Sequence, residues 1–179
     1  MAPVLYGWLM GSHHGGLARA KATAERLARR HHKGDAFTAH EHVAATQGRI
    51  LDVLSDPEAV RRWFPVPCEF EDEVGRLQAG KSYRTTGRLA GRHVHAELHV
   101  LEADEQRVRV SLVGHVIFDL DVELSPNGSG TDADIRVAVH PGGGLSGRLL
   151  TPAASALLRA GALGRTVHAI RAEAEAEQR

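Results

Sequence analysis

The chain has 179 residues, of which 42% are hydrophobic, and it carries 22 basic and 22 acidic residues. This length and composition predict one domain with a substantial core, together with an appendage. A lone cysteine, Cys68, excludes an internal disulfide and a cysteine-rich zinc site, and it suits a reducing cytoplasm.

The first 34 residues differ in composition from the rest. Their opening apolar stretch lacks a basic n-region and is short, so we expect neither a signal peptide nor a membrane span. Residues 17–32 are mostly Ala, Leu, Arg and Lys and predict a helix. Its positive face predicts weak contact of residues 17–33 with a membrane surface or another protein. The charge is carried by Arg19, Lys21, Arg26, Arg29, Arg30 and Lys33 against Glu25.

Residues 35–179 are predicted to form the folded domain. Because the extension is basic and the whole chain is neutral, this domain is net acidic, which argues against general nucleic-acid binding. The domain is expected to begin with a strand at residues 36–45, followed by a short helix at residues 48–56.

A second short helix is predicted at residues 55–65. Ser55 stands three residues before Glu58 in the spacing of a capping box, and Pro57 falls in the first turn. Pro65 then ends the helix. Because a helix this short is marginal on its own, we expect Trp63 to anchor it on a larger core.

Six further strands are predicted from segments in which apolar and polar residues alternate. The stretch Ser-Pro-Asn-Gly-Ser-Gly at residues 125–130 predicts a turn that joins the last two strands into a hairpin. The predicted strands span residues 68–74, 81–89, 92–101, 107–113, 116–124 and 131–139.

The chain is helix-compatible from the glycines at 142–144 to its C-terminus. We expect the helix to begin between Leu145 and Ala153, and Pro152 to kink it or to mark the start of its main part. The glycines predict a flexible joint that lets the helix settle over the sheet. Apolar residues recur at three-to-four spacing at Leu145, Leu149, Ala153, Ala156, Ala160, Leu163, Val167 and Ile170.

This order of elements resembles the SRPBCC superfamily, which includes START-related, polyketide-cyclase-like and birch-pollen-allergen-like proteins. The stretches that carry the resemblance are HVAATQGRILDVLSDPEAVRRWFP, LQAGKSYRTTGRLAG, HVLEADEQRV and ELSPNGSGTD. The resemblance implies an α+β helix-grip fold. In such a fold a curved seven-stranded antiparallel sheet wraps around a long C-terminal helix, and two short helices follow the first strand.

The expected ligand site is a cavity between this sheet and the helix. Glu41 shares strand parity with Val43, which predicts an inward carboxylate that either serves the site or lies hydrated at its rim. Tyr83 and Thr85 could supply hydroxyls, and Trp63 either packs in the core or lines the pocket. The residues expected to line the cavity are Phe37, Glu41, Trp63, Tyr83, Thr85, Val94, Leu98, Phe118, Val137, Leu149, Ala153, Ala156 and Ala160.

Four potential metal ligands alternate along one predicted strand. They share one face of the strand, as a metal site requires, but the apolar residues between them occupy the face that points to the core. These side chains therefore point to solvent, where nothing fixes their geometry, and we expect no metal site. The four residues are His93, His95, Glu97 and His99.

These features predict a soluble, cytoplasmic protein that binds a small hydrophobic or aromatic molecule, lipid- or polyketide-like, without a cofactor. Two alternatives stay open. One is a polyketide aromatase/cyclase- or dehydratase-like enzyme with Glu41 as its candidate catalytic residue. The other is a protein-interaction module that docks through the basic N-terminal helix. The sequence contains no nucleophile-elbow or phosphate-loop pattern, and it names neither the ligand nor the oligomeric state.

Overall fold

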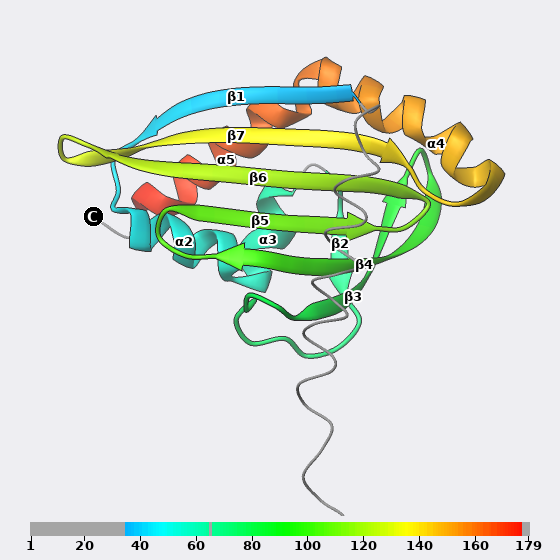
Figure 1. Cartoon of the computed structure of the whole chain (residues 1–179), viewed down its shortest axis with the longest axis horizontal. Helices are drawn as coiled ribbons and strands as arrows, with labels where there is room; N and C mark the ends of the chain where they lie inside the picture. Colours follow the sequence, from blue (N-terminus) through cyan, green and yellow to red (C-terminus); the bar gives the residue numbers. More distant parts are fainter. Residues whose placement is uncertain (1–34, 65, 177–179) are drawn as a thin grey trace, which may run out of the picture.

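A computed structural model of the chain describes residues 35–64 and 66–176. The helix predicted at residues 17–32 lies outside this part of the chain. The described residues form one large sheet with helices packed on one of its faces (Figure 1).

The sheet has seven antiparallel strands in the order β1-β7-β6-β5-β4-β3-β2, as the resemblance implied. Consecutive strands pair from β2 to β7, and β1 pairs with β7 to form one edge of the sheet. The segment predicted as a strand at 68–74 pairs over three residues only, because the acidic run that follows leaves the sheet. The strands are β1 (Asp35–Val43), β2 (Cys68–Phe70), β3 (Ser82–Leu89), β4 (Arg92–Ala103), β5 (Arg107–Val113), β6 (Val116–Asn127) and β7 (Gly130–Pro141).

Two short helices follow β1, and the C-terminal helical segment packs on the sheet, so the helix-grip fold is confirmed. Figure 1 shows α2, α3 and α5 on one face of the sheet, with α4 at one end of the strands. The helical elements are α2 (Gln47–Ser55), α3 (Pro57–Trp63), α4 (Gly144–Leu157), the π-turn η1 (Leu158–Ala162) and α5 (Leu163–Ala176).

The junction between α2 and α3 differs from the predicted capping box. Ser55 is the last residue of α2 and is buried. The N-cap of α3 is Asp56, whose carboxylate accepts a hydrogen bond from the backbone N–H of Glu58 at 3.1 Å. Asp56 takes this role because its backbone is extended while that of Ser55 is still helical. Pro57 occupies the first turn, as predicted.

The C-terminal helix is interrupted near its middle. Pro152 lies inside α4, which begins at Gly144, one residue before the predicted range. The break is the π-turn η1, where Gly161 has a φ of 89°. Because the backbone of Gly161 is left-handed and not helical, the chain kinks between α4 and α5, and the buried faces of the two helices are out of phase.

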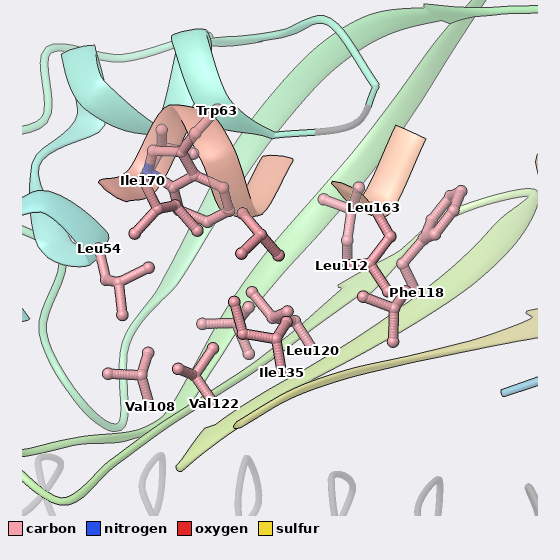
Figure 2. Close-up of a cluster of buried hydrophobic side chains, with 14 of the residues drawn as sticks. Leu54, Trp63, Val108, Leu112, Phe118, Leu120, Val122, Ile135, Leu163 and Ile170 are labelled. Atoms are coloured by element: carbon pink, nitrogen blue, oxygen red, sulfur yellow. The ribbon is translucent and has the colours of Figure 1, made fainter. Parts of the chain in front are cut away.

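The core lies between the inner face of the sheet and α5. Figure 2 shows Leu163 and Ile170 of α5 in the same cluster as Trp63 and the strand residues Phe118 and Leu120. Burial of each such side chain stabilises the fold by about 1.5–3 kcal/mol. The buried inner residues of β4 to β7 include Leu98, Val100, Val108, Leu112, Phe118, Leu120, Val122, Ile135, Val137 and Val139.

Candidate functional site

The inner face of the sheet brings together most of the predicted cavity residues. Leu98, Phe118 and Val137 are buried on it, and Val94 packs half-buried against the same cluster. Thr85 is 2% exposed, and its hydroxyl donates to the carbonyl of Ala96 at 3.1 Å. Both Tyr83 and Thr85 therefore lie on the helix side of β3, and the hydroxyl of Thr85 is engaged with the neighbouring strand.

Tyr83 lies nearer the rim of this face. Its phenolic oxygen accepts a hydrogen bond from the backbone N–H of Gln78 at 3.0 Å and donates to the carbonyl of Arg76 at 3.5 Å. Its ring meets Phe70 edge to face, with the ring centroids 6.3 Å apart. Tyr83 thus fastens the loop between β2 and β3 to the sheet.

Trp63 is 3% exposed and anchors α3, as expected from the shortness of that helix. Its indole Nε1 donates to the carbonyl of Val53 in α2 at 3.3 Å, so the polar edge of the ring is satisfied. Phe64 lies beside it at a centroid distance of 5.8 Å. A contact between Trp63 and a ligand stays a prediction.

Glu41 lies on the inner face of β1, where the sequence places it, and forms an ion pair with α5. Its carboxylate accepts a hydrogen bond from the guanidinium of Arg171 at 2.7 Å. Arg171 also contacts Glu175 at 3.0 Å, and Glu175 accepts from the backbone N–H of Ala44 at 3.0 Å. Two hydrogen bonds raise the pKa of Arg171, the one to Glu41 with the larger effect and the one to Glu175 with the smaller.

The sequence interpretation missed this partner of Glu41. The spacing of Arg171 and Glu175 is a visible i,i+4 pair, but β1 and α5 lie far apart in the sequence. The Glu41 side chain is 30% exposed, so the pair lies at the rim of the sheet and not deep within it.

The face of α4 that was expected to line the cavity requires correction. Leu149 is 71% exposed, Ala156 and Ala160 are exposed as well, and Ala153 is half-buried. The predicted stripe matches the buried face of α5 but not that of α4, because the kink at Gly161 separates the two helices. The buried positions of α4 and η1 are Gly147, Leu150, Ala154, Ser155, Leu158 and Ala162.

Phe37 lies half-buried on the inner side of β1, at the edge of the core. The guanidinium carbon of Arg159 lies 6.0 Å from the centre of its ring, a cation–π distance. The other end of that guanidinium group pairs with Asp35 at 2.6 Å. Arg159 therefore ties η1 to the first strand.

Two open grooves flank the loop between β2 and β3. The first has a volume of about 360 Å³ and includes Tyr83 in its lining. The second, of about 380 Å³, runs between the short helices and α5 and includes Asp52 and Glu173. Gly75 and Arg76 line both grooves. Charged side chains make up much of both linings, so the two grooves resemble solvent-filled surface depressions more than a hydrophobic ligand pocket.

The histidines of β4 lie on the outer face of the sheet, as their parity predicts. His95 lies 3.3 Å from the carboxylate of Glu71, and His99 lies 2.7 Å from the hydroxyl of Ser82. Within residues 35–64 and 66–176, no group of three or more His, Cys, Asp or Glu side chains is placed to hold a metal ion. In the same part of the chain, no helix has the length and apolar character needed to cross a membrane.

Cys68 is the single thiol of the chain and lies half-buried at the start of β2. Burial raises the pKa of its thiol to about 11. The group is therefore protonated at neutral pH, and Cys68 is a poor nucleophile.

The geometry described above defines a helix-grip protein. Residues 35–175 match the sequence profile of a family described as "Polyketide cyclase / dehydrase and lipid transport". The match covers most of the chain, so the protein belongs to this family, in agreement with the resemblance to the SRPBCC superfamily. A search of curated proteins gave no match.

Solved structures share the fold at low sequence identity. Protein NE0264 from Nitrosomonas europaea is 18% identical, with a TM-score of 0.59 over 80% of this chain and 96% of that one. A START superfamily protein from Mycobacterium smegmatis is 20% identical, with a TM-score of 0.55 over 78% and 97%. Ara h 8.0201 is 13% identical, with a TM-score of 0.55 over 80% and 99%. These similarities establish the fold and leave the ligand open.

Proposed function

We propose that the protein binds a small hydrophobic molecule, lipid- or polyketide-like, between its sheet and its C-terminal helix. The main support is the composition of the inner sheet face on β3 to β7. None of the residues that point inward on these strands, from Tyr83 to Val139, is charged. An uncharged, mostly apolar surface of this kind suits an apolar ligand. The family description, which includes lipid transport, supports the same proposal.

The proposed site lies where α4 covers one end of this face. The buried side of α4 carries the small residues Ala154 and Ser155. Gly147 on the same side is close-packed, because a Cβ there would lie 2.6 Å from the carbonyl oxygens of Gly142 and His115. Gly144 and Gly161, both with positive φ, lie at the start of α4 and in η1 after it. Movement of α4 about these two glycines is the proposed route by which a ligand reaches the inner face.

The enzymatic alternative requires a group on the inner face that can move a proton. The hydroxyls of Tyr83 and Thr85 are already hydrogen-bonded to backbone groups, and Glu41 is paired with Arg171. These engagements favour binding over catalysis as the proposed function.

The binding proposal is tested by native mass spectrometry and by displacement of 1-anilinonaphthalene-8-sulfonate with fatty acids and aromatic polyketides. The test variant is Ala154→Leu, which adds volume to the buried side of α4, and its control is Ala156→Leu on the exposed side. We expect Ala154→Leu to weaken binding by more than about tenfold, since the larger side chain would occupy the space proposed for the ligand. Equal affinity of the two folded variants, or the absence of any displaceable ligand, would contradict the proposal.

A further inference from the structure

The exposed side of α4 is apolar. Leu145 and Leu149 are 77% and 71% exposed, and they are the large hydrophobic residues most exposed to solvent in the described part of the chain. Helical spacing places Pro152 and Ala156 on the same side. We call Leu145, Leu149, Pro152 and Ala156 the α4 stripe. The opposite side of α4 faces the sheet, so the α4 stripe is left exposed to solvent among the described residues.

The end of the molecule that carries this stripe is also basic. The β3–β4 turn, the β5–β6 turn and the end of β7 meet there, because Gly142 donates to the carbonyl of His115 at 2.9 Å and α4 contacts β3. Figure 1 shows the β3–β4 turn rising beside α4. The sequence segments 84–96, 107–118 and 136–172 contain no Asp or Glu.

Three exposed arginines stand in these segments near the stripe. Arg88 and Arg92 flank the β3–β4 turn, and Arg148 lies within the first turns of α4 between Leu145 and Leu149. Asp104 and Glu105 lie in the β4–β5 turn at the opposite end of the strands, whereas Asp35, at the same end as α4, is paired with Arg159. The three segments without acidic residues therefore give the α4 end an excess of basic side chains, although the total charge of the chain is neutral.

We propose that the α4 stripe docks on the surface of an anionic lipid bilayer. Leu145 and Leu149 enter the boundary between headgroups and acyl chains, and Arg88, Arg92 and Arg148 meet the lipid phosphates. A helix with exposed leucines and neighbouring arginines has the composition of an interfacial element. Electrostatic attraction to anionic lipid complements a surface that has no carboxylate in its three basic segments.

A second copy of the chain fits this surface less well. A symmetric contact through the α4 stripe would bring the basic ends of both copies together, and like charges oppose such a contact. The exposed side of one helix of 14 residues is also small beside the roughly 800 Å² that each partner of a stable complex buries. Docking on a bilayer, unlike dimerisation, requires neither a self-complementary charge pattern nor a large interface of complementary shape.

The experiment is flotation of the full chain with vesicles of phosphatidylcholine, with and without about 30 mol% phosphatidylglycerol. Leu145→Ser/Leu149→Ser removes the apolar part of the stripe, and Ala172→Ser/Ala176→Ser on α5 is its control. Arg148→Glu reverses one charge at the basic end, and Lys81→Glu reverses one charge at an exposed position before β3, at the other end of that strand from the β3–β4 turn.

We expect binding to the anionic vesicles that weakens as NaCl rises. The double serine variant should lower it by at least about tenfold and Arg148→Glu by about fivefold, while both controls bind as the unmodified chain. Because Leu145, Leu149 and Arg148 are exposed, these variants should keep the melting temperature. Binding that persists in the double serine variant, no binding at all, or self-association of the chain abolished by the same variant would each overturn the proposal. Ligand binding is not involved in any of these outcomes.

Discussion

At the residue scale, Trp63 is the side chain on which the short helix α3 depends. It is 3% exposed and hydrogen-bonded to Val53. We predict that Trp63→Ala lowers the free energy of unfolding by about 3–5 kcal/mol, because it leaves a large cavity. Phe64→Ala is the matched control at a half-buried position and should have a smaller effect. Urea denaturation followed by circular dichroism measures both, and equal losses would show that Trp63 has no special anchoring role.

Glu41 tests whether the rim carboxylate serves the ligand or the fold. Its ion pair with Arg171 is partly exposed, and such pairs contribute about 0–1 kcal/mol. We therefore expect Glu41→Gln to change the free energy of unfolding by less than about 1 kcal/mol and to leave dye displacement unchanged. Glu175→Gln, which alters the other partner of Arg171, is the control. A tenfold or larger change in affinity confined to Glu41→Gln would make this residue a ligand anchor, as its strand parity first suggested.

His40 gives a prediction about pH. The hydrogen bond from His40 to Asp134, 2.9 Å long, raises the pKa of the imidazole above its ordinary value. The stabilising effect of the pair is therefore fully present below the unfolded pKa of about 6.5, and it is lost as the pH rises through the raised pKa of the folded state. We expect the NMR titration midpoint of His40 to lie above about 6.5 and to fall in the Asp134→Asn variant. An unchanged midpoint in that variant would remove Asp134 as the cause.

At the scale of elements, the break between α4 and α5 depends on one glycine. Gly161 has a φ of 89°, and the Cβ of an alanine there would meet no atom closer than Arg165 Nη1 at 4.0 Å. The effect of Gly161→Ala is therefore conformational, and we expect a loss of about 1–2 kcal/mol in unfolding free energy. Gly164→Ala, in the regular helix with open space around it, should instead raise stability by about 0.5–1 kcal/mol. Thermal denaturation of the two variants should shift in opposite directions, and a shared direction would contradict the strained turn.

The elements also show which features a sequence can reveal. The alternation in β4 and β6 is local, and it predicted both the strands and their inner faces. The inner face of α4 was not predictable in the same way, because the three-to-four spacing of apolar residues continues unbroken across the kink at Gly161. The pairing of Glu41 with Arg171 depends on the docking of α5 against β1, which only the folded chain defines.

At the scale of the whole molecule, the domain is expected to fold without its basic extension. The family match begins at residue 35, where β1 starts, and Asp35 is held by Arg159 within the domain. We predict that deleting residues 1–33 shifts the melting temperature by only a few degrees and leaves the affinity for hydrophobic dye unchanged. The deletion removes Arg19, Lys21, Arg26, Arg29, Arg30 and Lys33 together with Glu25, so any salt-sensitive association should weaken. Calorimetry and vesicle flotation at two salt concentrations measure these effects. Failure of the shortened chain to fold would place the extension inside the core and move the domain boundary.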